Sequence, residues 1–426
     1  MDPDFTSGDR ISDGESAILL SSVISLIMMS VLSSSGDIPL GLAGNFIAFS
    51  SYILFIGIFI SLFPVFELPK KPLLAFVIIH MLFIIGLVRD LSGLINHPSS
   101  YTFPTSNIQI LLYTAEVIGY IVASITLVFL IPKVISRDRF FLTVVSISSF
   151  SILIGIPAYV IGDFSIFGVD ITTYTALDPL RQYGIRIPAL ASIFADANAM
   201  SKIAAAGLLG SHYLHVQRQS KVYLLLLGLN ICGLFLANSR MAIIAVIIAY
   251  SVYFVYRIFG KTTTIVYLGT SSVLGSIFFI LIVLNIGTGS FVPTDGFAGR
   301  ISLWKAAVES FLQHPAVGIG IHNVGEAISA YTGASSIAPQ NSYLSIFVAG
   351  GVIGGVSYLL VITTSTFKYI TKIESRADLL TICLLITFIL IQFTDTSHPF
   401  GVNKNALIFG VTLGYVIDGV YNSRNN

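Results

Sequence analysis

The chain consists mainly of apolar segments that are long enough to cross a lipid bilayer. A bilayer core takes a helix of about 20 predominantly apolar residues. About twelve segments approach that length, with limits near 17–35, 43–64, 72–88, 108–131, 140–161, 189–213, 222–238, 241–257, 264–286, 341–364, 379–395 and 405–421. This pattern predicts an all-α, polytopic membrane protein in which residues 1–426 form a single transmembrane domain.

Composition supports the same fold class. Charged residues make up only 10% of the chain, whereas soluble domains average about 25%. The formal net charge is +1, which gives no indication of nucleic-acid binding. Cys232 and Cys383 both lie inside apolar runs, so they are expected to be small buried apolar side chains rather than metal ligands.

Lysine and arginine in the loops predict the orientation, because cytoplasmic loops carry the excess of these residues. The first 16 residues are acidic and polar and lack the basic region of a secretory signal, so the first apolar run is expected to remain as a span. With the N-terminus in the cytoplasm, inner segments hold 14 Lys and Arg and outer segments hold 7, with Lys202 inside a span. We therefore expect a multi-pass protein of the cytoplasmic membrane with both termini inside.

The outer cations differ from the inner ones in kind. Five of the seven outer cations are arginine, whereas seven of the fourteen inner ones are lysine. The arginine fork matches phosphate oxygens, which indicates a phosphate-bearing ligand at the outer face. The two longest loops, 162–188 and 287–340, are both predicted to be outside. Loops of this length are usually functional, so the active site is expected to face the outside or periplasm.

The first candidate constellation follows loop 162–188. Arg181 and Arg186 flank a Tyr-Gly step, and Pro188 is expected to open the next helix. Asp196 and Asn198 would then lie near the outer N-terminus of that helix, whose dipole favours an anion. The alternative is that the two arginines contact lipid headgroups or pair with Asp178.

Two more arginines precede predicted helices. Arg240 follows Ser239, which can cap the eighth span, and it would sit at the outer interface. Arg300 opens a segment with apolar residues at helical spacing, which predicts a short amphipathic helix that Pro315 would stop. The alternatives are an interfacial snorkelling arginine and a plain interfacial helix anchored by Trp304.

The segment APQNSYLSIFVAGGVIGG enters the tenth span. Asn341 or Ser342 can cap this helix, and its four glycines are expected to serve close helix packing. Gln340 and Asn341 could act in catalysis or only in capping. Asp395, at the outer end of the eleventh span, could orient a base, pair with an arginine or act as a cap.

These stretches resemble the O-antigen ligase and O-antigen polymerase superfamily. Four features in order carry the resemblance, which covers residues 181–355. They are the Arg181/Arg186 pair followed by DAN, the SR step that opens a span, the R-x3-W segment running into HPAVGIG, and QNSYLSIFVAGGVIGG.

The resemblance implies an integral membrane glycosyltransferase that opens to the outer face and uses neither a metal ion nor a cofactor. Its donor is a polyprenyl-diphosphate-linked glycan, and its partners are a sugar acceptor and membrane lipid, with a flippase and a chain-length regulator as further candidates. Polymerases join repeat units, whereas ligases transfer the finished chain to a lipid A core. The implied diphosphate-binding residues are Arg181, Arg186, Arg240, Arg300 and Asn198.

One position departs from the family pattern. Family members often have His-Asn where this chain has Gln340-Asn341, and in ligases that histidine is the expected acceptor base. Glutamine cannot take up a proton at neutral pH. His322 and His398 remain alternative candidates for the base, and the departure favours a polymerase over a ligase. The candidate catalytic residues are His322, Gln340, Asn341, Asp395 and His398.

A transporter or lipid flippase is the alternative of another class. Such a protein should bury paired charges near the middle of the membrane and contain repeated halves. We find no internal repeat, and only Lys202 and Asp196 match the first criterion. The remaining cations cluster at the two faces, which favours the enzyme.

The charge distribution predicts the side of each loop. In a background without the two native cysteines, a cysteine introduced at Ser329 should react with a membrane-impermeant reagent in intact cells. A cysteine at Ser375 should react only after the cells are opened, because its loop is cytoplasmic. The reverse labelling would overturn the orientation and the outer placement of the active site together.

Overall fold

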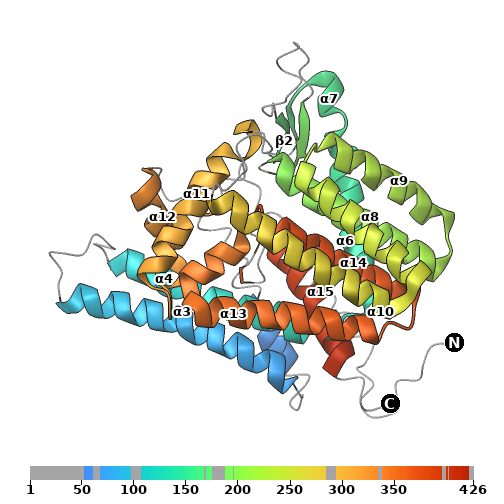
Figure 1. The fold of residues 1–426 in the computed structure, drawn as a ribbon. Coiled ribbons are helices and arrows are strands. Elements are labelled where there is room, and N and C mark those ends of the chain that lie inside the picture. Colours follow the sequence, from blue (N-terminus) through green and yellow to red (C-terminus); the bar gives the residue numbers. More distant parts are fainter. Residues whose placement is uncertain are drawn as a thin grey trace.

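The computed structural model describes residues 52–60, 68–96, 107–166, 169–174, 188–194, 196–284, 294–333, 338–395, 400–401 and 403–421 (Figure 1). Residues 52–60 are helical. The labelled helices are α3 (Lys70–Asn96), α4 (Asn107–Ile125), the π-helical turn η1 (Thr126–Leu130), α5 (Ile131–Val134), α6 (Arg137–Gly155), α7 (Ala158–Ile161), α8 (Ala197–Arg218), α9 (Lys221–Leu236), α10 (Arg240–Leu284), α11 (Thr294–Gln313), the 3-10 turn η3 (Ile321–Asn323), α12 (Val324–Thr332), α13 (Ser342–Thr371), α14 (Arg376–Ile391) and α15 (Lys404–Tyr421). The predicted span 17–35 and part of 43–64 lie outside the described residues.

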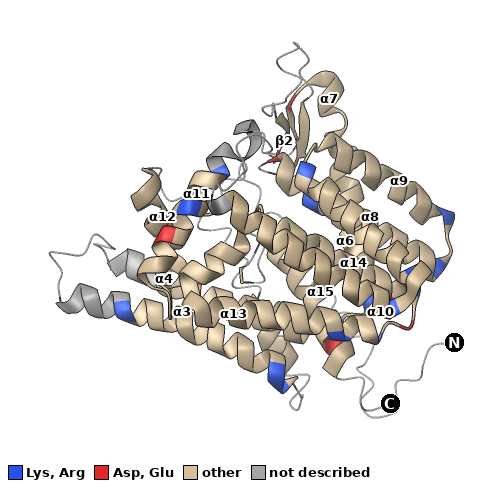
Figure 2. Cartoon of the chain, viewed as in Figure 1, with Lys and Arg blue, Asp and Glu red and all other residues tan. Residues whose placement is uncertain are grey.

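The prediction of a helical membrane protein is confirmed. Within the described part of the chain, five segments are long and apolar enough to cross a bilayer: Lys70–Arg89, Thr114–Val134, Arg137–Ile161, Arg240–Ile282 and Ser342–Thr371. The middle of α3, α9 and α13 carries no charged residue (Figure 2). The count of twelve spans stays a prediction.

Lipid-facing surfaces can be identified from exposed apolar side chains. One face of α3 exposes a stripe at helical spacing, made of Leu74, Val77, Met81, Ile85 and Val88. A stripe of this kind would be unfavourable in water, and it marks a surface that lipid or another protein covers. The opposite face of α3 packs against α13. Helix α14 is instead buried on nearly all sides, between α8, α10 and α15.

The all-α prediction misses a small antiparallel sheet. Strands β1 (Phe164–Ile166), β2 (Val169–Tyr174) and β3 (Ala189–Ser192) pair in the order β1-β2-β3. Pro188 precedes β3 and not a helix, so the predicted start of the sixth span at 189 was wrong. The Tyr159 hydroxyl donates to the Pro188 carbonyl at 2.7 Å, and Ser192 Oγ donates to the Ser151 carbonyl at 2.6 Å. These contacts hold the strand against α6 and α7, and α8 begins only at Ala197.

Helix α10 folds back on itself at Gly260, which has φ 78° and ψ −176°. The hydroxyl groups of Ser251 and Tyr267 lie 2.8 Å apart. In a straight helix these two residues would be separated by about 24 Å along the axis. The two arms are therefore antiparallel, and they correspond to the predicted spans 241–257 and 264–286.

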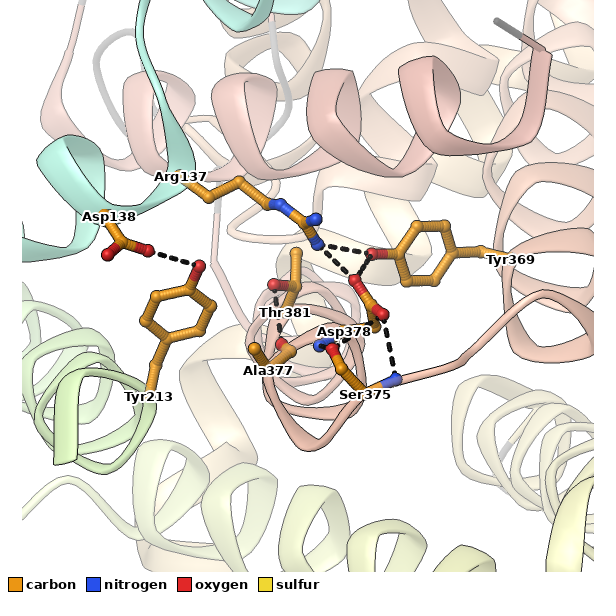
Figure 3. A network of polar contacts seen from close by, with 8 residues as sticks. All are labelled: Arg137, Asp138, Tyr213, Tyr369, Ser375, Ala377, Asp378 and Thr381. Atoms are coloured by element: carbon orange, nitrogen blue, oxygen red, sulfur yellow. Dashed lines mark hydrogen bonds and ion pairs between the residues drawn. The ribbon is translucent and has the colours of Figure 1, made fainter. Parts of the chain in front are cut away.

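A polar network joins the start of α6, the end of α13 and the start of α14, which the charge count assigns to the inner side (Figure 3). Arg137 forms an ion pair with Asp378, and both contact the Tyr369 hydroxyl, at 3.0 and 3.1 Å. Ser375 and Asp378 form a capping box at the start of α14. The structure thus brings predicted inner segments to one end. A cysteine at Ser375 would remove the cap of α14. The neighbouring Glu374 is exposed, so a cysteine there can be labelled in the same experiment and leaves the cap intact.

Helix α13 is interrupted at Gly351, which has φ 62° and ψ −162°. The loop that follows α11 fills the interruption with its own backbone. Val352 N donates to the Pro315 carbonyl at 2.7 Å, and Ile319 N donates to the Val348 carbonyl at 3.0 Å. Irregular backbone inside a membrane protein must satisfy its polar groups within the protein. The glycine-rich segment HPAVGIG therefore completes a broken helix.

Glycines permit this close approach. A side chain at Gly318 would overlap the Ala349 carbonyl group, and one at Gly351 would overlap the Ala316 carbonyl group. Gly350 and Gly354 instead face Leu82 of α3, and a methyl group added at each would lie 3.6 and 3.2 Å from Leu82 Cδ1. Of the four glycines predicted to serve packing, Gly350 and Gly354 fit that role against α3, whereas Gly351 breaks the helix.

The neighbouring glycines give a matched test. Gly351→Ala should lower the apparent free energy of unfolding by about 2 kcal/mol or more, because it combines a positive φ with a clash against backbone. Gly350→Ala should change it little, because its methyl group would meet only an ordinary contact. Thermal unfolding of both purified variants in the same detergent checks this, and equal stability of the pair would contradict the role assigned to Gly351.

Candidate active site

The N-terminal ends of three helices and the C-terminal end of a fourth meet at one place, which we call the polar junction. It is formed by the starts of α8, α13 and α15 and by residues 392–395 after α14. Ser342 N donates to the Gln392 carbonyl at 2.9 Å, and Ser342 Oγ donates to the Asp395 carbonyl at 2.9 Å. All four segments belong to the predicted outer side.

Gln340 and Asn341 have different partners in the junction. Arg300 Nε, from α11, donates to Gln340 Oε1 at 2.9 Å. Asn341 Oδ1 accepts from Leu344 N at 2.9 Å and caps α13, while its Nδ2 donates to the Phe393 carbonyl at 2.9 Å. The capping prediction for Asn341 is confirmed. Gln340 has φ 48°, so the backbone there is strained for a residue other than glycine.

Asp395 forms an ion pair with Lys202 of α8. The Lys202 side chain is 7% exposed and that of Asp395 is 30% exposed, so the pair lies at the boundary between interior and surface. A buried lysine needs such a partner, because removing an ammonium group from water is costly. Of the roles predicted for Asp395, pairing with a cation is the one found, although the cation is a lysine and not an arginine.

Lys404 is a site residue that the sequence analysis missed. It is the first residue of α15, just before the predicted span 405–421, and is only 4% exposed. Its ammonium lies 4.6 Å from the centre of the Phe194 ring. Burial and then the Lys202 charge lower the pKa of Lys404 to about 7, against the opposing effects of Asp196 and Asp395. Its sequence signal was a cation directly before an apolar run.

Two further predicted residues are exposed. Asn198 lies four residues before Lys202 on α8 and therefore near the same face of that helix. Arg240 is the first residue of α10, next to Ser239. Among the residues that the structure describes, Arg240 makes no ion pair or hydrogen bond with the polar junction.

His322 lies apart from Gln340. It belongs to the short turn η3, which contacts α3, α4 and α13, and it is 8% exposed. The adjacent Gly320 N donates to the Ala349 carbonyl at 2.9 Å, about two turns along α13 from Asn341. At 1.5 Å per residue, that places His322 roughly 12 Å from the helix start along its axis.

Arg181, Arg186 and His398 lie outside the described residues, so their predicted roles stay predictions. In the described part of the chain, no three His, Cys, Asp or Glu side chains come together as a metal site. The expected independence from metal ions also stays a prediction.

Trp304 lies one turn after Arg300 and is part of the packing beneath the site. The predicted amphipathic helix is α11, which ends before Pro315 as expected. Trp304 is 2% exposed, and its ring packs 5.1 Å from that of Phe279 in α10. Phe279 in turn contacts Phe393, which contacts Tyr343. The idea that Trp304 anchors this helix in the lipid interface was wrong, because protein surrounds its side chain.

Comparison with known proteins agrees with the resemblance found in the sequence. The family model described as O-antigen ligase matches residues 224–359. Residues 224–359 are therefore similar to the O-antigen ligase family. The resemblance to the O-antigen ligase and polymerase superfamily is confirmed, and no curated protein matches the chain in a separate search.

The matched domain spans about a third of the chain, from α9 to the first half of α13. It includes Arg240, Arg300, His322, Gln340 and Asn341. The family supports a glycosyltransferase-like enzyme of the membrane that uses a lipid-linked glycan and an acceptor. The other part of the polar junction, with Lys202, Asp395 and Lys404, lies outside the match.

Proposed function

We propose that this protein is a polysaccharide polymerase that joins polyprenyl-diphosphate-linked oligosaccharide repeat units at the outer face of the cytoplasmic membrane. The observation that carries the proposal is the match of residues 224–359 to the O-antigen ligase family, because this segment contains both Arg300 and its partner Gln340. A flippase would deliver the lipid-linked units, and a chain-length regulator would act with the enzyme.

The reaction is a single displacement at an anomeric carbon. An acceptor hydroxyl oxygen attacks this carbon, the bond to the diphosphate oxygen breaks, and the diphosphate leaves with the electron pair. The hydroxyl proton passes to a base, and the anomeric configuration is inverted. Arginines and helix N-termini can stabilise the charge that develops on the diphosphate. A base adds a factor of about 10²–10⁴, so several arginines together, at about 10²-fold or more each, should contribute more than any one base.

Gln340 supports polymerase over ligase. Its amide cannot accept a proton at neutral pH, and its carbonyl oxygen accepts a hydrogen bond from Arg300. It can orient a hydroxyl or fix Arg300, but it cannot act as the histidine expected of ligases. The ligase remains the second candidate, because the matched family is described as O-antigen ligase. A lipid A core acceptor would be required for that activity.

One observation bears on the transporter alternative. The ion pair between Lys202 and Asp395 is the kind of buried charge pair that transporters use. An assay of the purified protein in detergent distinguishes the enzyme from the transporter, because detergent micelles offer no membrane across which a substrate could be transported. Formation of longer glycans from lipid-linked oligosaccharide under these conditions is expected from the enzyme alone.

The outer arginines should be essential for product formation. Arg181→Ala, Arg186→Ala and Arg300→Ala should each lower glycan extension by about 10²-fold or more, because each removes a donor to the diphosphate. Lysine at the same positions should restore little of the activity, since it retains the charge but cannot form the bidentate hydrogen bonds of arginine. Arg218→Ala, at an exposed position on the predicted inner side, is the matched control. Full activity of all three alanine variants would rule out the proposal that these arginines bind the diphosphate.

The two candidate bases can be tested in the same assay. If His322 is the base, His322→Gln should lose extension and still bind the lipid-linked donor, while His398→Gln should have a mild effect. The converse is expected if His398 is the base. Normal extension by the double variant would eliminate both, and it would leave Gln340 to orient the hydroxyl while the arginines supply most of the catalysis.

A further inference from the structure

The polar junction contains a buried lysine, Lys404, that forms no ion pair among the described residues. Lys404 is 4% exposed, and among the described residues its side chain forms no hydrogen bond or ion pair. Its ammonium group instead lies over the face of the Phe194 ring, in a cation–π contact. Of the two carboxylates whose charges act on Lys404, Asp395 pairs with Lys202 and Asp196 caps α8. A buried cation in this situation destabilises a fold unless something else compensates it.

The backbone around Lys404 adds to the positive potential. Helices α8, α13 and α15 all begin at the junction, so the positive ends of three helix dipoles point towards it. The side-chain caps are Asp196 on α8 and the neutral Asn341 on α13. The C-terminal end of α14 and the carboxylates of Asp196 and Asp395 oppose this potential, but Asp196 is exposed and Asp395 is only half-buried. The two side chains that are fully buried, Lys202 and Lys404, are both cationic when protonated, and such a site favours an anion.

Two buried polar atoms of residues at the junction lack partners among the described residues. Gln392 Nε2 is a donor and Asn405 Oδ1 is an acceptor, and neither has a hydrogen bond. Gln392 lies at the end of α14, where its backbone carbonyl accepts from Ser342 N, and its side-chain Oε1 accepts from the Tyr358 hydroxyl at 2.6 Å. Asn405 follows Lys404 directly. Buried polar groups are normally satisfied, so these atoms are consistent with a polar ligand that occupies the junction.

We propose that Lys404 and Lys202 form an oxyanion site that binds an anionic group of the glycan substrate. The ligand oxygens belong to a phosphate or a carboxylate. Lys202 has three N–H donors and uses one on Asp395, so it can donate to a second acceptor without losing that pair. The substrate class rests on the proposed function. The oxyanion could come from the donor diphosphate or from an acidic sugar of the repeat unit.

The test measures binding by the purified full-length protein to two pairs of probes. The first pair is polyprenyl diphosphate against the corresponding polyprenol, and the second is an oligosaccharide with one glucuronate against the same oligosaccharide with glucose. Wild type should bind the anionic member of at least one pair more tightly. Lys404→Met should weaken that binding about tenfold or more, as expected for a lost charge-assisted hydrogen bond. Lys404→Arg should retain most of it.

The affected pair identifies the source of the oxyanion. Weakened diphosphate binding assigns Lys404 to the donor, and weakened glucuronate binding assigns it to an acidic sugar. The matched control is Lys133→Met, at the other end of the protein, where Lys133 pairs with Asp418 at 3.1 Å. This variant should bind all probes as wild type does. Unchanged affinity of Lys404→Met in both pairs, or no preference of wild type for an anion, would overturn the proposal.

Stability separates a ligand-binding lysine from a structural one. Without ligand, Lys404→Met should have an apparent Tm equal to or above that of wild type, because it removes an uncompensated buried charge. A lower Tm together with unchanged probe affinity would mean that Lys404 is structural. Glycan extension by wild type is scored separately. If anion binding depends on Lys404 but no glycan is extended, the proposed function fails and the oxyanion site stands.

Discussion

The interruption of α13 is the constraint on which the candidate site depends. A helix inside a membrane protein cannot leave its backbone groups unpaired, and the positive φ of Gly351 ends the regular pattern. The loop at 314–320 supplies the missing partners from another part of the chain. Arg89 of α3 donates in turn to the carbonyls of Gly318 and Ile319, at 3.3 and 3.1 Å. The first half of α13 is thereby fixed against α3, and its capped end is fixed in the polar junction.

Several features could be predicted from residue patterns because short-range physics determines them. The helix after 341 begins where the Asn341 cap indicates, and α11 ends where Pro315 requires. The two arms of α10 follow from the lengths of two apolar runs. The sequence points to both Arg300 and Gln340, although only the folded chain places them 2.9 Å apart across 40 residues.

Other features depend on long-range contacts that no local pattern contains. The segment at 189–192 is apolar enough to begin a span, yet it forms a strand because it pairs with β2 and packs on α6. Trp304 has the composition of an interfacial anchor, but Phe279 covers it. In the sequence, Lys404 is only one outer cation among seven. Its burial without a carboxylate of its own arises from the meeting of three helix ends distant in sequence.

The contact between α3 and the loop at 314–320 also bears on how genetic variation in this protein should be interpreted. The backbones of Gly86 and Gly320 are in close contact, so a Cβ atom at position 86 would lie 2.5 Å from the Gly320 Cα. Even alanine there would push the loop away from the broken helix. In a screen for defective alleles, position 86 would therefore score like a catalytic residue, although it lies in an apolar helix that holds none of the candidate site residues.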